Sequence, residues 1–150
     1  VRDRFDQIRK KILTGQRDAA TLKKEVWDMR EKMRAQRLKP NEPVVDLKQT
    51  HGGIVDIEFL VQYMILKHAR NHPDIIVWTD NIRLLESLDA AGVITAEQSE
   101  TLQRAYVAMR QAIHHLNLQE GALSPEDDTF ARHRENVQTL YNRLLAGNKN

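Results

Sequence analysis

The chain has 150 residues, a net charge of +2 and no cysteine. It therefore has no disulfide bond, no thiolate metal site and no cysteine nucleophile, and it lacks the run of about 18 apolar residues that a transmembrane helix requires. The hydrophobic fraction of 41% suits one core, so we expect a single domain over residues 1–150. The charged start is not a signal peptide, and we expect a cytoplasmic segment of a longer protein.

Charge is unevenly distributed along the sequence. Residues 1–39 contain 13 Lys and Arg against 6 Asp and Glu, a net of +7, whereas residues 40–150 contain 10 against 15, a net of −5. A basic region of this kind can face phosphates, nucleic acid or an acidic protein surface. A solvated helical face with i,i+4 ion pairs is the alternative, and the sequence favours it.

The first two predicted helices cover the basic region. Residues 2–13 place Phe5, Ile8 and Ile12 on one stripe, and Thr14-Gly15 ends that helix. A second helix is expected from a cap at Asp18 to about residue 37. Its apolar residues recur at the four–three–four spacing of a helix seam, namely Leu22, Val26, Met29 and Met33.

Two arginines of the second helix form a candidate binding pair. Arg30 and Arg34 are four residues apart and therefore share one face. Two guanidinium groups in this arrangement could grip a phosphate or a carboxylate. Surface arginines paired with Glu31 and its neighbours are an equally good interpretation.

A break and a turn separate the second helix from the next one. Two prolines interrupt residues 39–43, and Val44–Lys48 forms a short extended segment that is either a connection or an edge strand for a neighbouring domain. Gly52 and Gly53 favour a tight turn that packs against other helices. An anion cradle is less favoured there, because Asp56 would put a carboxylate in the phosphate position. Lys48 and His51 could still reach a nucleotide or a partner.

The third predicted helix is the most apolar segment of the chain. From Ile54 to Leu66 only Asp56, Glu58 and Gln62 are polar, so a helix buried on most faces is expected. The side chains of Asp56 and Glu58 would diverge by roughly 200° on a helix, which is poor geometry for one metal ion. His68 and His72 have a chelating spacing but no evident third ligand. We therefore expect no metal site.

Three further helices complete the prediction. Thr79 or Asp80 caps a fourth helix closed by Gly92, and Thr95-x-x-Gln98 is a capping box for a helix to about residue 118. Ser124-Pro125 with Asp127 predicts the start of a last helix that ends near residue 145. Six amphipathic helices with short connections predict an all-α helical bundle with one short extended segment at 44–48.

One long motif resembles a known family. The pattern D-L-K-x-x-x-G-G-I-x-D-I-E-F-x-x-Q, from Asp46 to Gln62, is similar to the signature of the helical domain in glutamine synthetase adenylyltransferases. A related helical domain occurs in uridylyltransferases of the PII signalling protein. Segments around residues 25–34, 78–86, 104–106 and 114–116 also resemble that family, so the resemblance covers most of the chain. It is most similar to the C-terminal copy, which follows the second nucleotidyltransferase domain.

The resemblance implies a role inside a larger bacterial enzyme. The parent enzyme would use ATP and Mg²⁺ to transfer AMP to a tyrosine of glutamine synthetase, would also remove it, and would sense glutamine and PII protein. This helical domain would support the preceding nucleotidyltransferase domain and transmit control. Its partner-facing or nucleotide-facing candidates are Lys48, Arg30, Arg34 and His51, and its structural joint is Asp46, Gly52, Gly53, Asp56 and Glu58.

No residue of the chain is expected to be catalytic. Polymerase-like nucleotidyl transfer needs carboxylates that converge on Mg²⁺, and the sequence has neither a D-x-D motif nor a Gly-Ser turn. No bound cofactor is expected in the chain itself. The alternative is a stand-alone basic module that binds nucleic acid or an acidic protein, although the aromatic content of 5% argues against stacking on single strands.

Overall fold

The structure is a computed structural model that describes residues 2–39, 44–125 and 128–145. Over these ranges the chain forms a bundle of helices with no β-strand, which confirms the predicted all-α fold. None of the described helices is both long and apolar enough to cross a lipid bilayer. The elements in order are α1 (Arg2–Leu13), α2 (Ala19–Arg37), α3 (Ile54–His68), the 3₁₀ helix η1 (Pro73–Ile76), α4 (Asn81–Ala90), α5 (Ala96–Leu118) and α6 (Ala131–Leu144).

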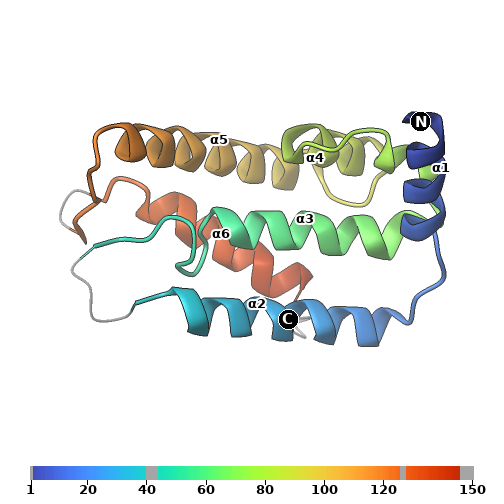
Figure 1. Ribbon diagram of the computed structural model, residues 1–150, viewed down its shortest axis with the longest axis horizontal. Coiled ribbons are helices and arrows are strands. Elements are labelled where there is room, and N and C mark those ends of the chain that lie inside the picture. The colour runs from blue at the N-terminus through green and yellow to red at the C-terminus, as the bar shows by residue number, and fades with distance from the viewer. Residues whose placement is uncertain (1, 40–43, 126–127, 146–150) are drawn as a thin grey trace.

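Helix α3 lies at the centre of the bundle. It packs against α2, α4, α5 and α6, and Figure 1 shows α4 and α5 on one side of it and α2 on the other. Eight of its residues are buried, including Ile57, Leu60 and Val61 with no exposed surface. The nearly all-round apolar pattern predicted this central position, because a helix with apolar residues on most faces needs neighbours on most faces.

Helix starts follow the predicted caps. The Asp18 carboxylate accepts a hydrogen bond from the Thr21 amide, and the Asp80 carboxylate accepts one from the Arg83 amide. Thr95 and Gln98 form a complete capping box at the start of α5. Each cap satisfies amide groups that a helix terminus otherwise leaves without partners.

The connections differ from the sequence-based prediction in two places. Val45 pairs in a single antiparallel bridge with Leu123, and Leu47 and Lys48 already belong to the turn before α3, so the extended segment is shorter than the predicted 44–48. Helix α6 begins only at Ala131, so the predicted cap at Ser124-Pro125 was wrong; just before the helix the Asp128 carboxylate accepts a hydrogen bond from the Phe130 amide. Asp127, which was predicted to lie in the acidic first turn of that helix, is outside the described residues.

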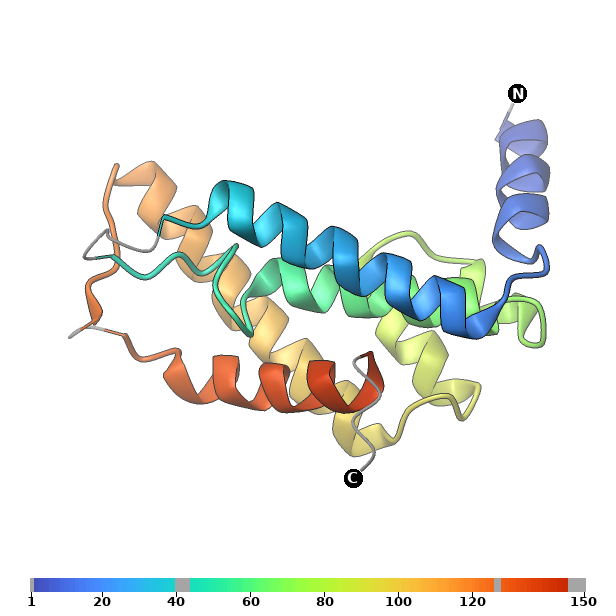
Figure 2. The same cartoon turned by 90° about the horizontal axis from the view of Figure 1, so that it is seen from below.

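Helix α1 stands apart from the rest of the bundle. Figure 2 shows it at one end of the bundle, pointing away from the other helices. None of its residues is buried, and the stripe of Phe5, Ile8 and Ile12 is exposed. Arg9 anchors it by donating to the carbonyl oxygens of Ile76 and Trp78.

Candidate functional site

The motif from Asp46 to Gln62 forms the turn at 46–53 and the first part of α3. Together with α2, these segments make a buried polar cluster that we call the junction. Asp56, in the first turn of α3, has 1% of its surface exposed, and Arg30 and Arg34 of α2 have 0% and 5%. The Nε atom of Arg30 and the Nη2 atom of Arg34 each lie 2.5 Å from Oδ1 of Asp56. The two arginines therefore bind a carboxylate, as their spacing suggested, and that carboxylate belongs to the same chain.

The remaining polar atoms of the junction are also paired. Arg30 donates to the side-chain and backbone oxygens of Gln49 at 2.9 and 3.0 Å, and Arg34 donates to Glu31 at 3.0 Å. The second oxygen of Asp56 accepts the Gly52 amide at 2.8 Å. Two guanidinium groups and two carboxylates thus balance in charge, which is how buried ions are normally accommodated.

Both glycines of the motif are required by this packing. Gly52 has φ of +76°, and a Cβ atom there would overlap the backbone of Arg134 in α6. A Cβ at Gly53 would lie 2.6 Å from the carbonyl oxygen of Leu47. The predicted tight turn against other helices is confirmed, and α6 is the helix that it meets.

Sequence reasoning missed two members of this region. Gln49 is buried and binds Arg30 through two oxygens, yet its amide gave no signal within a turn. The Tyr141 ring of α6 packs 5.5 Å from Trp27, and its buried hydroxyl has no partner in the described part of the chain. Burial, followed by the negative charge of Asp56, raises the pKa of that hydroxyl.

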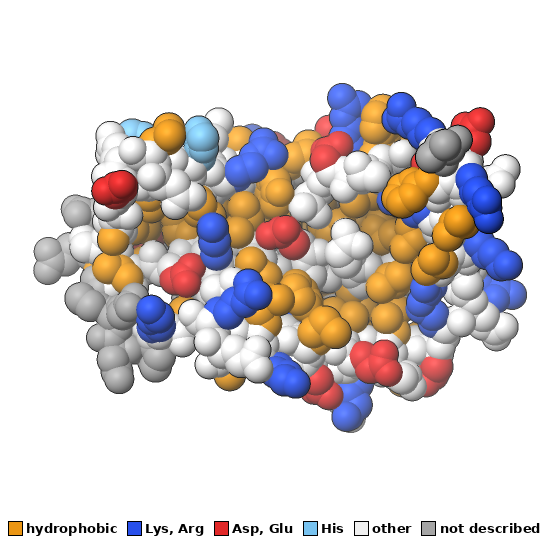
Figure 3. Space-filling model, viewed as in Figure 1, with side chains coloured by type: hydrophobic (Ala, Val, Ile, Leu, Met, Phe, Trp, Pro, Cys, Tyr) orange, Lys and Arg blue, Asp and Glu red, His pale blue; other side chains and the backbone are white. Residues whose placement is uncertain are grey.

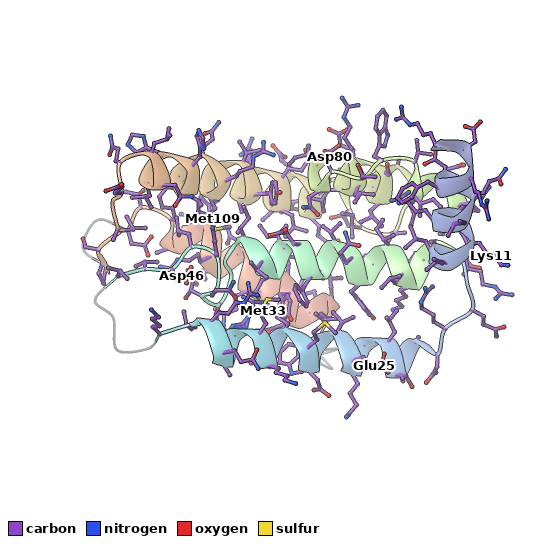
Figure 4. All side chains as sticks on the ribbon, viewed as in Figure 1. Lys11, Glu25, Met33, Asp46, Asp80 and Met109 are labelled. Carbon is purple, nitrogen blue, oxygen red and sulfur yellow. The ribbon has the colours of Figure 1, made fainter. Side chains whose placement is uncertain are left out.

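The exposed part of the motif is small. Lys48 and His51 are exposed on the turn, where the Asp46 carboxylate accepts the amides of Lys48 and Gln49. Figure 4 places Asp46 at the end of the bundle where the chain enters α3. Arg30 and Arg34 do not share this surface, since their guanidinium groups are enclosed. Of the four predicted partner-facing residues, the structure brings only Lys48 and His51 to the surface.

A groove runs beside the junction between α2 and α3. Its walls are mainly apolar and its volume is about 490 Å³, and we call it the α2–α3 groove. Glu58 lies on its edge, where desolvation raises the pKa of its carboxyl group against the opposing charges of Arg30 and Lys48. The apolar lining residues are Leu22, Val26, Met29, Phe59 and Leu66.

The described residues do not fit a magnesium–nucleotide centre. No group of three or more His, Cys, Asp or Glu side chains converges among them. Asp56 is enclosed by two arginines and the Gly52 amide, which leaves it no free oxygen for a cation. His68 and His72 lie with their rings 6.5 Å apart, and burial lowers the pKa of His68.

Comparison with known proteins identifies the protein family to which the chain belongs. The family model described as GlnD PII-uridylyltransferase matches residues 20–127, from the start of α2 to beyond the end of α5. The chain therefore belongs to this family of nucleotidyltransferase-associated domains.

Two curated proteins are similar to nearly the whole chain. The chain is 37% identical to the bifunctional glutamine synthetase adenylyltransferase/adenylyl-removing enzyme of Mannheimia haemolytica and 43% identical to the enzyme of the same name from Hahella chejuensis. Each match covers 97% of this chain but only 15% and 16% of the respective relative. The chain thus spans about one sixth of the length of the relatives that it matches.

Proposed function

We propose that the chain is a helical accessory and regulatory domain of a bifunctional glutamine synthetase adenylyltransferase/adenylyl-removing enzyme. The observation that carries the proposal is the 37–43% identity over 97% of the chain, confined to about one sixth of each relative. The parent enzyme would transfer AMP from ATP to a tyrosine of glutamine synthetase and would remove it again. The alternative of a stand-alone nucleic-acid-binding module gains no support from these relatives.

Mg²⁺ and ATP belong, in this proposal, to another domain of the parent enzyme. The described side chains offer no converging set of carboxylates, and Asp56 is fully committed to the buried junction. Nucleotidyl transfer needs such a set to polarise the phosphates. The chain would therefore contribute support and contacts rather than reacting groups.

The buried junction and the exposed turn would have separate roles. Arg30 and Arg34 would act as positioning residues that fix the turn against α2, because both are enclosed and ion-paired. Lys48 and His51, which are exposed on the same turn, would face the nucleotide, the preceding nucleotidyltransferase domain or a protein partner. Glutamine synthetase, PII protein and glutamine are the proposed partners and effector, in the bacterial cytoplasm.

Reconstitution tests the proposed function. The nucleotidyltransferase part of a relative, produced without the region that corresponds to this chain, is supplied with glutamine synthetase, Mg²⁺ and labelled ATP. Adding the chain is expected to restore or change AMP transfer or removal. If both proteins are folded by circular dichroism and the chain changes neither reaction, the proposal is wrong.

Substitutions in the intact enzyme test the exposed turn. Lys48→Ala and His51→Ala are expected to lower AMP transfer, AMP removal or the response to glutamine and PII protein. Lys24→Ala is the matched control, since Lys24 is also an exposed lysine but lies on α2 away from the turn. Equal activity and effector response in all three variants would remove these two residues from the site.

A further inference from the structure

Helix α1 has an apolar face that no other described part of the chain covers. Phe5, Ile8 and Ile12 share one side of the helix and are 65%, 49% and 59% exposed. A twelve-residue helix has little stability of its own in water, and most helices gain theirs by burying such a stripe. Among the described residues, the stripe therefore lacks the covering surface that such a helix normally has.

The α2–α3 groove is an apolar surface on another part of the same chain. Its outer wall includes Met29, which is 62% exposed, and its floor includes Phe59 and Leu66 of α3. Figure 3 shows hydrophobic side chains along the middle of this face and on α1 at one end of it. Groove and stripe thus lie on the same side of the molecule.

The spacing of the stripe matches the α2 wall of the groove. In an antiparallel pair of helices, facing residues have numbers that add to a constant value. The apolar residues of α1 are separated by three and then four positions, and those of the α2 wall have the same separations when read in reverse. All three pairs share one register: Phe5 with Met29, Ile8 with Val26, and Ile12 with Leu22.

The linker between α1 and α2 is long enough for this register. Residues 14–18 separate α1 from α2, and five residues are enough to join two antiparallel helices. Gly15 lies in that linker and allows its backbone to change conformation. Glu25 and Glu58 line the groove, although α2 as a whole carries six basic and three acidic residues, and α1 carries five and two.

We propose that the α2–α3 groove is an interaction surface for a basic amphipathic helix, and that α1 of the same chain is that helix. The structure shows the open position, in which Arg9 binds the carbonyl oxygens of Ile76 and Trp78. In the closed position α1 folds back along α2 and covers the groove. The arrangement makes α1 an intramolecular competitor of any other helix that binds there.

Disulfide trapping tests the closed position, because the native chain contains no cysteine. Ile8→Cys with Val26→Cys places one thiol on each helix at a facing pair. Mild oxidation is expected to give an intrachain disulfide at a rate that does not depend on protein concentration. Adding Arg9→Ala is expected to increase that rate, because it removes the two hydrogen bonds that hold α1 open.

The control pair uses the same helices. Lys10→Cys with Val26→Cys puts the first thiol on the opposite side of α1. This pair is therefore expected not to form the intrachain disulfide. Disulfides that join two chains would show that the groove takes a second copy and would overturn the proposal. Equal trapping of both pairs would also overturn it, since that would reflect a mobile α1 without a docking site.

Hydrogen exchange gives an independent reading without cysteines. Closure is expected to protect the amides of α1, and Ile8→Asp is expected to abolish that protection while the amides of α5 keep theirs. If Ile8→Asp leaves the exchange of α1 unchanged, α1 does not use its apolar stripe to dock, and the proposal fails.

Discussion

At the scale of single residues, Asp56 carries the charge balance of the buried junction. It faces two guanidinium groups that have at most 5% of their surface exposed. A buried charge that loses its partner keeps the full cost of its desolvation, whereas an exposed pair is worth little. The stability of the fold should therefore respond strongly to this one carboxylate.

Asp56→Asn is expected to lower the free energy of unfolding by about 3–5 kcal/mol, because the two buried guanidinium groups then lose the carboxylate that compensates their charge. Urea denaturation measures the change. Asp28→Asn is the matched control, since its pair with Lys24 is exposed and is expected to contribute at most about 1 kcal/mol. A loss below about 1 kcal/mol for Asp56→Asn would show that the junction is not held by this charge.

Comparing substitutions at Gly52 and Gly92 distinguishes the cost of backbone strain from the cost of steric overlap. Both have φ of +76°, but a Cβ at Gly92 meets no atom within 4 Å, whereas one at Gly52 overlaps Arg134. Gly92→Ala is expected to cost about 1–2 kcal/mol of unfolding free energy from the left-handed conformation alone. Gly52→Ala is expected to cost clearly more, as measured by thermal or urea unfolding. Equal costs would mean that α6 moves away freely.

Glu58 makes the free energy of unfolding depend on pH. Desolvation raises the pKa of its carboxyl group above 4.5 in the folded state, so its protonated form favours folding. That contribution is complete below pH 4.5 and is lost as the pH rises through the folded-state pKa. Relative to the native chain, Glu58→Gln should therefore be more stable at about pH 7 than at about pH 4. Urea midpoints at both values check this, with the exposed Glu86→Gln as control.

The sequence predicted the type of chemistry in the junction better than its location. The shared face of Arg30 and Arg34 correctly indicated that they could hold a carboxylate. It could not show that Asp56 supplies this carboxylate, because that contact depends on how α2 packs on α3. Their burial was not predicted, because arginine side chains on a helix are mostly exposed.

At the scale of elements, α3 supplies the core and is expected to be the most sensitive helix. Leu60 has no exposed surface, whereas Leu118 at the end of α5 is 72% exposed. Leu60→Ala is expected to cost about 2–5 kcal/mol of unfolding free energy, and Leu118→Ala less than about 0.5 kcal/mol. Similar costs for the two, measured by urea denaturation, would contradict the central position of α3.

Helix positions followed from periodicity and caps, but helix neighbours did not. The seam predicted for α2 was partly wrong, since Met29 is exposed and the buried face turns towards Arg30 and Arg34. The spacing of apolar residues identifies one face of a helix but not the surface that covers it. In α2, the buried network of Arg30 and Arg34 occupies part of the face that packs on α3. The stripe of α1 illustrates the same limit.

At the scale of the whole molecule, the contacts of α3 with four other helices predict cooperative unfolding. The slowest-exchanging amides are expected in α3, with an exchange free energy equal to that of global unfolding. Native-state hydrogen exchange at increasing urea tests this. Exchange of α3 through an opening of lower free energy than α5 or α6 would contradict it.

The paired arginines also decide which movements the bundle permits. To slide α2 along α3 by one turn, about 5.4 Å, two enclosed guanidinium groups would first have to leave their carboxylate. Tilting α2 and α3 together would keep these bonds but would separate the buried face of α3 from α4, α5 and α6. A molecule that pulls on the exposed Lys48 or His51 would therefore act on the bundle as a whole, because the turn that carries these residues is bound to α2 through the arginines and packs against α6 at Gly52.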